Sequence, residues 1–228
     1  MRQFVNTSLV RRNDYLGRGL IILGLLLFLG GFLYSFKEPD AFVGLSVVLI
    51  VGIMLSQSGL MIFSRWGSKP RDFEIFGSEL RGFSDHHLLI HFALKAKHIF
   101  LCPGGVFNLI PIRHEGDVRA QDGDLIIKTR PQGVFKRSRT LRIKSVQSAA
   151  RREANRLARS VARVIESDDP ITVASICVFL ASEVTILDNN ENLRVVHLKQ
   201  LKSELRKSCK TKGRFATDQI DKIVDHIS

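Results

Sequence analysis

Two long runs of uncharged, mostly apolar residues near the N-terminus dominate the pattern of the chain. They extend from Gly19 to Phe36 and from Ala41 to Ser64, with a short polar segment between them. A helix rises about 1.5 Å per residue, so roughly 20 apolar residues cross a hydrocarbon core about 30 Å thick. Pro39 prevents one continuous helix. The pattern predicts a transmembrane helical hairpin over residues 19–64, with a cleaved signal peptide as the alternative for the first run.

After a linker at 65–72, the pattern changes to short apolar segments separated by turn residues. Val146 to Ile165 has apolar residues at three- and four-residue steps, which predicts one long amphipathic helix. The other predicted elements are helices at 73–80, 198–206 and around 220–227 and strands at 87–94, 98–101, 106–112, 125–128, 171–180, 184–187 and 193–197. The expected fold class is α/β: a transmembrane hairpin followed by a domain at 73–207 with a mixed sheet. A linker and an amphipathic helix follow at 208–228.

Small residues recur along both apolar runs. They are Gly17, Gly24 and Gly31 in the first helix, and Gly44, Gly52, Ser56 and Gly59 in the second. Such stripes let helix backbones approach closely in lipid, although glycine is also simply common in membrane helices. The runs contain no acid, lysine, arginine or histidine, and Gln57 is their one strongly polar side chain. Two helices of this kind indicate an anchor rather than a pore.

Basic residues flank the hairpin on one side. Four arginines precede the first run within residues 1–18, and Arg65, Lys69 and Arg71 follow the second. Positive charge near membrane ends stays in the cytoplasm. We therefore expect a two-pass protein of the inner (cell) membrane, with the segment 1–18, the main domain and both termini cytoplasmic.

The composition indicates which classes of partner the chain would bind. The formal net charge is +12 and the sequence pI about 10.1, which favours anionic partners such as lipid headgroups or nucleic acid. The three cysteines, Cys102, Cys177 and Cys209, are far apart and odd in number. They show neither a metal-binding spacing nor a secreted disulfide framework, which fits a reducing cytoplasm.

The stretch from Lys95 to Ile110 contains His-Ile-Phe-Leu-Cys-Pro-Gly-Gly-Val-Phe, a strand, a tight turn and a second strand. It resembles the nuclease-related (NERD) domain, in which a strand with Asp-His leads through a Gly-Pro-x-Gly-Val-Phe turn to a strand with Glu-x-Lys. The resemblance covers about Phe76 to Arg206 and includes the Arg- and Ala-rich helix and the later Val-Phe strand. It implies a restriction-endonuclease-like domain.

The nuclease motif itself is altered. The family's acidic and basic motif positions fall on Lys97, Ile110 and Ile112, while His98 keeps the companion histidine. Aliphatic side chains and a cation cannot bind Mg²⁺, which requires oxygen ligands. We therefore expect no catalytic residues, no metal and no cofactor. The alternative is a nuclease that uses Mg²⁺ or Mn²⁺ and rearranged acids, namely Glu115, Asp117 and Asp124.

Five histidines, at positions 86, 87, 91, 98 and 114, are candidate ligands for a metal ion. His87 and His91 would share a strand face, yet no cysteine or carboxylate joins them at ligand spacing. We expect these histidines to be packed or solvated.

A basic block is the stronger functional lead, because no acid occurs between Asp124 and Glu153. Its cations are Lys128, Arg130, Lys136, Arg137, Arg139, Arg142, Lys144, Arg151 and Arg152. Each cation near a membrane contributes about 1 kcal/mol of attraction to an anionic leaflet. Phosphates of nucleic acid would attract the same block, and a solvated loop without a partner is the third alternative.

These patterns together predict a membrane-anchored, non-catalytic NERD-like domain that binds or scaffolds at the cytoplasmic membrane face. The alternatives are the metal-dependent nuclease and a protein that tethers DNA to the membrane. The sequence identifies no protein partner.

Overall fold

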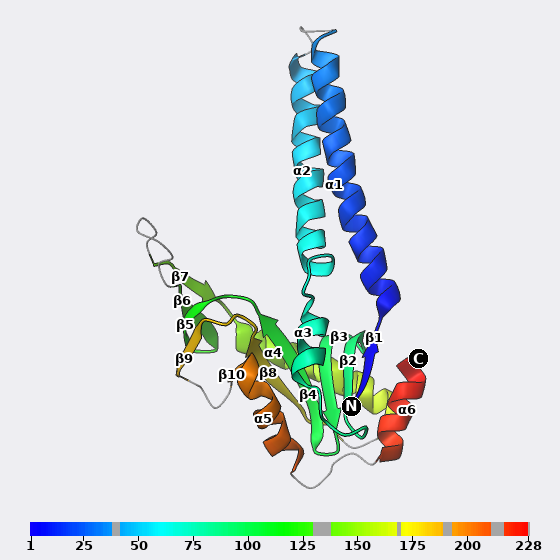
Figure 1. Ribbon diagram of the computed structural model, residues 1–228, viewed down its shortest axis with the longest axis vertical. Coiled ribbons are helices and arrows are strands. Elements are labelled where there is room, and N and C mark those ends of the chain that lie inside the picture. Colours follow the sequence, from blue (N-terminus) through cyan, green and yellow to red (C-terminus); the bar gives the residue numbers. More distant parts are fainter. Residues whose placement is uncertain (38–41, 130–137, 168–169, 189–192, 211–216, 228) are drawn as a thin grey trace. The chain divides into compact units, whose positions relative to one another are not determined.

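The computed structural model describes residues 1–37, 42–129, 138–167, 170–188, 193–210 and 217–227 (Figure 1). The chain forms two compact units. One is Asn6–Arg71, and the other joins Met1–Val5 to Asp72–Ser228. Part of the polar turn expected at 37–40 lies outside the described residues.

The first unit is a pair of long helices, α1 (Thr7–Ser35) and α2 (Phe42–Trp66). Both are long and apolar enough to cross a membrane. Their large apolar side chains are mostly exposed, for example Phe32 at 59%, Val43 at 78% and Met54 at 65%. Helix α1 begins well before the predicted apolar run, where the Asn6 side chain accepts a hydrogen bond from the Leu9 N–H at 3.1 Å.

The two helices pack through the predicted small residues. A Cβ added to Gly24 would lie 2.8 Å from the Gly52 carbonyl oxygen, and one added to Gly59 would lie 2.8 Å from the Gly17 carbonyl oxygen. These contacts leave no space for a larger side chain, because backbone meets backbone. Gly44 differs from the prediction, since it is exposed and has no atom within 4 Å of its added Cβ.

An ion-pair cluster lies near one end of this unit. The Asp14 carboxylate pairs with Arg18 at 2.9 Å and with Arg71 at 3.4 Å, and it is only 14% exposed. Arg71 belongs to the segment expected to be a plain linker. The cluster joins that segment to the first helix across 57 positions of sequence.

The second unit is built on a six-stranded mixed sheet with the order β1-β2-β3-β4-β8-β10. Strands β2, β3 and β4 are antiparallel neighbours, whereas β4–β8, β8–β10 and β1–β2 are parallel pairs. The strands are β1 (Arg2–Val5), β2 (Leu88–Ala93), β3 (Ala96–Cys102), β4 (Gly105–Ile112), β8 (Val173–Phe179) and β10 (Arg194–His197).

Helices cover both faces of this sheet. Helices α3 (Asp72–Glu79) and α5 (Leu198–Cys209) pack on a core that includes Phe76, Phe100 and Leu201. Helices α4 (Val146–Ile165) and α6 (Thr217–Ile227) pack on the opposite core, which includes Leu157 and Ile223. The amphipathic pattern of α4 is confirmed, because its apolar positions are the buried ones.

A smaller four-stranded sheet has the order β7-β6-β5-β9. Its strands are β5 (Gly116–Gln121), β6 (Asp124–Lys128), β7 (Thr140–Ile143) and β9 (Val184–Asp188). Val118, Leu125 and Ile127 of this sheet share a core with Ile112 of β4 and Phe179 of β8. The expected α/β class with a mixed sheet is therefore confirmed.

Three strands differ from the sequence expectation. β1 lies in the segment assigned only as an N-terminal tail, and it pairs with β2 from Arg2↔Leu88 to Val5↔His91. β5 begins at Gly116, where the sequence indicated only turns. β7 is a four-residue edge strand that had not been predicted.

Candidate functional site

The positions of the altered nuclease motif lie on the neighbouring strands β3 and β4. Lys97 is exposed on β3, whereas Ile110 is half-buried and Ile112 buried on β4. Both isoleucines pack with the core of the four-stranded sheet. Aliphatic packing thus occupies the two β4 positions to which the sequence resemblance assigns a metal-binding acid and a lysine. Among the described residues, no three His, Cys, Asp or Glu side chains form a group that could hold a metal ion.

The alternative acids are spread apart. Asp117 is opposite Lys128 in the β5–β6 pair, whereas Asp124 is opposite Gln121 at the other end. Four residue steps along a strand separate the two ends by about 13 Å. Glu115 is exposed just before β5. The structure therefore does not bring these three acids together around one ion.

Asp124 has a structural role instead. Its carboxylate accepts hydrogen bonds from the Ser145 backbone N–H at 2.6 Å and from the Arg142 Nε at 2.7 Å. These two bonds hold the pKa of Asp124 below its usual range. The carboxylate fixes the approach from β7 into α4, where Ser145 adopts a left-handed conformation with φ of 56°.

The described members of the basic block lie on β6, on β7 and its flanks, and on the first turns of α4. These elements are contiguous, because the Gln147 N–H at the start of α4 donates to the Gly123 carbonyl between β5 and β6 at 3.0 Å. Arg142 forms an ion pair with Asp124. The other described cations of the block are exposed: Lys128, Arg139, Lys144, Arg151 and Arg152. Arg130, Lys136 and Arg137 lie outside the described residues.

The outer face of α4 extends this basic surface. Arg156, Arg159 and Arg163 follow Arg151 and Arg152 along the helix, and all five are exposed. The basic block predicted from the sequence ends at Arg152. The acid-free stretch of the sequence ends at Glu153. The exposed face of α4 continues beyond that residue, so the cations on it also belong to the basic surface.

His91 and His98 form a buried pair. They are opposite each other in the β2–β3 pairing, are 0% and 1% exposed, and have their Nδ1 atoms 2.8 Å apart. One Nδ1 must carry the proton that the other accepts. Burial lowers the pKa of His91 to about 3, and the Nε2 of His91 has no hydrogen-bond partner within the described part of the chain. Both rings stay neutral, and they pack against Phe73, Phe76 and Phe92.

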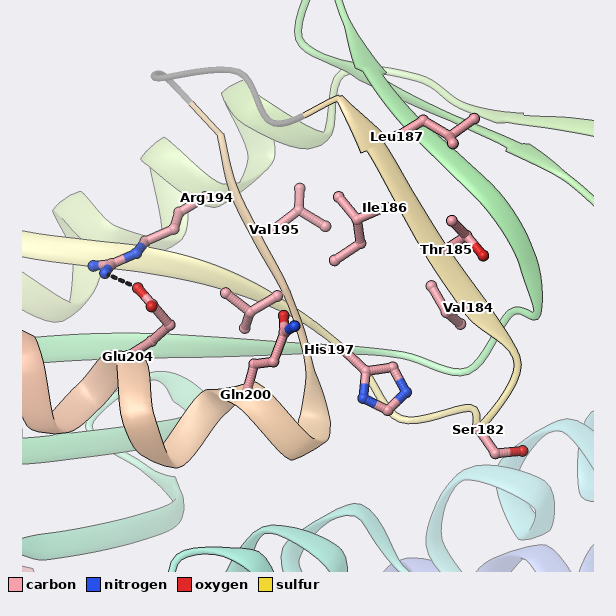
Figure 2. A pocket seen from close by; sticks show the side chains of 11 residues that line it. Ser182, Val184, Thr185, Ile186, Leu187, Arg194, Val195, His197, Gln200 and Glu204 are labelled. Carbon is pink, nitrogen blue, oxygen red and sulfur yellow. Dashed lines mark hydrogen bonds and ion pairs between the residues drawn. The ribbon is translucent and has the colours of Figure 1, made fainter.

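A cleft of about 650 Å³ lies between β9, β10 and α5. Figure 2 shows Ile186 and Val195 facing each other across it. At one end the Arg194 guanidinium donates to the Glu204 carboxylate at 2.6 Å, and this ion pair lowers the pKa of Glu204. His197 caps α5 through its Nδ1, which accepts from the Lys199 N–H, and its Nε2 bonds the Ala181 carbonyl. Arg194, Glu204 and His197 are thus engaged in holding α5.

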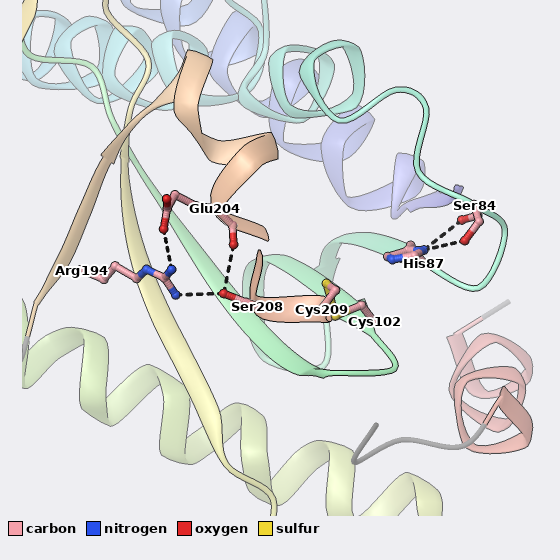
Figure 3. The surroundings of a disulfide bond; sticks show 7 residues. All are labelled: Ser84, His87, Cys102, Arg194, Glu204, Ser208 and Cys209. Atoms are coloured by element: carbon pink, nitrogen blue, oxygen red, sulfur yellow. Dashed lines mark hydrogen bonds and ion pairs between the residues drawn. A yellow bond between two sulfur atoms is a disulfide. The ribbon is translucent and has the colours of Figure 1, made fainter. Parts of the chain in front are cut away.

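The cysteines differ from the sequence expectation. Cys102, at the end of β3, and Cys209, at the end of α5, form a disulfide with a Cα–Cα distance of 6.0 Å (Figure 3). Only Cys177 is a free thiol, and burial raises its pKa to about 12. The β3–β4 turn lies close to α5, since a Cβ on Gly104 would be 2.7 Å from the Ser208 carbonyl oxygen. Spacing could not reveal this pairing, because the tertiary fold alone brings the two cysteines together.

Comparison of the chain with protein-family models, with curated proteins and with solved structures finds no match. Function is therefore inferred from the geometry and charge described above.

Proposed function

We propose that the chain is a membrane-anchored, non-catalytic module whose basic surface contacts anionic lipid headgroups at the cytoplasmic face of the inner membrane. The observation that carries the proposal is the continuous set of exposed cations on β6, β7 and α4 in a chain with two helices long enough to span a bilayer. A tethered domain stays near the lipid surface, so modest attraction per cation is sufficient for contact.

We further propose that residues 73–207 are a degenerate, restriction-endonuclease-like NERD domain. In support, β3, the Pro103–Gly105 turn and β4 follow one another as adjacent antiparallel strands, in the order of the family motif. The packing of Ile110 and Ile112 with apolar neighbours supports a domain that uses its sheet for structure rather than for metal chemistry.

Hydrogen exchange of the full chain in nanodiscs tests the lipid contact. We expect amides of β7 and the first turns of α4 to exchange more slowly in phosphatidylcholine–phosphatidylglycerol discs than in phosphatidylcholine discs. High salt should remove the difference, because headgroup attraction is screened. The double variant Arg139→Glu, Lys144→Glu should abolish the difference between the two kinds of disc. The control variant Lys97→Glu, Lys222→Glu changes the net charge by the same amount at exposed positions elsewhere, and it should preserve the difference.

Equal exchange in both kinds of disc would overturn the lipid proposal. Salt-sensitive binding of duplex DNA that is lost in the Arg139→Glu, Lys144→Glu variant would replace it with the DNA-tethering alternative.

The nuclease alternative has its own test. Purified full chain should leave plasmid DNA intact with Mg²⁺ or Mn²⁺, because Asp117 and Asp124 lie at opposite ends of their strand pair. Cleavage that requires the metal and disappears in Asp117→Ala would establish an enzyme.

Sidedness is tested with reporters fused after residue 228. A fluorescent protein that folds only in the cytoplasm should be bright, and alkaline phosphatase, which is active only outside it, should be silent. The opposite result would reverse the orientation argued from the arginines and lysines that flank the hairpin.

A further inference from the structure

A second basic site lies on α5, away from the basic block of β6, β7 and α4. It is a concavity of about 410 Å³ lined by the side chains of Glu79 on α3 and of Lys199, Lys202, Ser203, Arg206, Lys207 and Lys210 on and after α5. The lining has five cations and one acid, which leaves an excess of four positive charges. The sequence pattern predicts only a helix and a linker here.

The cations follow one stripe of the helix. Positions 199, 202, 206 and 210 are three or four residues apart, so like charges are neighbours along the helix surface. Such pairs of like charge destabilise a helix slightly. Packing on the sheet does not explain the stripe, because α5 contacts the sheet through Leu201 and Leu205 on its buried face.

The helix dipole explains only part of the stripe. Cations in the last turn, such as Arg206 and Lys207, are favoured by the partial negative charge at the C-terminal end. Lys199 lies in the first turn, which contains no acid and where a cation is disfavoured. The helix dipole therefore does not explain Lys199.

Contacts within the domain hold the middle of the stripe in place. The Lys202 ammonium donates to the Arg81 carbonyl, and the Arg206 guanidinium lies 5.6 Å from the centre of the Phe83 ring. Lys207 pairs with Glu204 at 3.0 Å. At the two ends, Lys199 and Lys210 have no side-chain partner among the described residues. The site thus combines positioned cations with two that remain available.

We propose that this concavity binds a compact polyphosphate, a molecule with two or more phosphomonoester groups. Each phosphomonoester carries about −1.5 to −2 charges at neutral pH, so two of them balance the excess charge of the site. An arginine and several lysines are the side chains that bind phosphate, the arginine through a planar fork and the lysines as point charges. The phosphates could belong to a soluble metabolite or to a phosphorylated lipid headgroup. The site goes beyond the proposed lipid contact, because it uses different residues.

Calorimetry on the full chain in phosphatidylcholine nanodiscs tests the soluble source, with inositol hexakisphosphate as the probe. Nanodiscs that contain phosphatidylinositol 4,5-bisphosphate test the lipid source through slower hydrogen exchange of α5. We expect saturable binding of the polyphosphate in at least one of these two experiments. Lys199→Gln with Lys210→Gln should weaken it about tenfold or more for each lost charge-assisted bond. The domain should stay folded, because neither side chain forms a hydrogen bond or ion pair within the described structure.

The matched control is Lys97→Gln with Lys222→Gln, which removes two exposed cations outside both basic surfaces and should leave polyphosphate binding unchanged. Absence of saturable binding in both arms would overturn the proposal. So would binding that both double variants weaken equally, since it would reflect net charge alone. Binding of single-stranded oligonucleotides but of neither polyphosphate, lost in the α5 variant, would also overturn it.

Discussion

At the scale of single residues, the buried histidine pair of β2 and β3 makes the stability of the domain depend on pH. Burial lowers the pKa of His91 to about 3, and burial with the nearby His91 and Lys97 lowers that of His98 well below its usual value. In the unfolded chain both titrate near 6.5. Below that pH the unfolded chain binds protons at these histidines that the folded chain does not. Their contribution to the free energy of unfolding is therefore fully present above pH 6.5 and is lost progressively as the pH falls below it.

We predict an acid-sensitive β2–β3 hairpin. Between pH 6.5 and about 3 the free energy of unfolding should fall by up to about 1.4 kcal/mol per pH unit through His91. His98, whose pKa is also lowered, should add to this fall. Hydrogen exchange of the β2 and β3 amides, corrected for intrinsic rates, measures this fall. His91→Leu with His98→Leu should flatten the profile, whereas the exposed His86→Gln should not. A double variant with the wild-type profile would contradict the role of the pair.

The turn between β2 and β3 is another residue-scale feature. Leu94 and Lys95 have φ of 52° and 63°, and the pair Ala93↔Ala96 flanks them. Two central residues with positive φ are typical of a type I′ hairpin turn, which usually contains Asn or Gly. The left-handed conformation costs an ordinary residue about 1–2 kcal/mol.

We predict that Lys95→Gly stabilises this domain by about 1 kcal/mol, because glycine adopts positive φ without steric cost. Lys97→Gly is the matched control two positions along. It lies on extended β3, where glycine should destabilise by about 0.5–1 kcal/mol. Urea unfolding of the detergent-solubilised full chain, followed by exchange of hairpin amides, measures both. Equal effects of the two substitutions would show that the turn is not strained.

At the scale of elements, the spacing of apolar residues predicted most helices and strands. It missed short strands in which this spacing is not distinctive. The helix α4 was visible because its buried residues repeat at helical steps over 20 residues. β5 was missed because Gly116-Asp117 resembles a turn, although Val118 and Ala120 face inwards and Arg119 does not. β1 owes its conformation to pairing with β2, far along the chain, and local pattern does not encode that pairing.

The packing of α1 on α2 gives the element-scale prediction. Gly24→Leu should force the helices apart, because its added Cβ would meet the Gly52 carbonyl oxygen and the Ser56 nitrogen at 2.8 and 3.0 Å. We expect a lower thermal midpoint for the detergent-solubilised chain. Gly30→Leu is the matched control on the same helix, since a Cβ there meets nothing within 4 Å. Equal loss in both variants would indicate a general cost of substituting glycine rather than helix packing.

At the scale of the whole molecule, the two-unit organisation follows from the lengths of the apolar segments, whereas the candidate site follows only in part. Charge counting found the basic surface of β7 and α4, because its residues are close in sequence. It missed the α5 concavity, whose acid Glu79 and supporting carbonyl at Arg81 lie on distant segments. The same limit applies to the disulfide, whose cysteines are separated by 107 positions.

That disulfide provides the last prediction. A cross-link over so long a segment restricts the unfolded chain strongly, so reduction should lower the free energy of unfolding by about 2–4 kcal/mol. Urea unfolding of the full chain with and without reductant, followed by exchange of α5 amides, measures the difference. Cys102→Ser with Cys209→Ser should be insensitive to reductant and resemble the reduced wild type. If the serine variant responded to reductant as the wild type does, the stabilisation would have another source. Because the domain is proposed to be cytoplasmic, where thiols are kept reduced, maleimide added during denaturing lysis of cells should modify both cysteines. Only the oxidised, purified chain should then show the added stability.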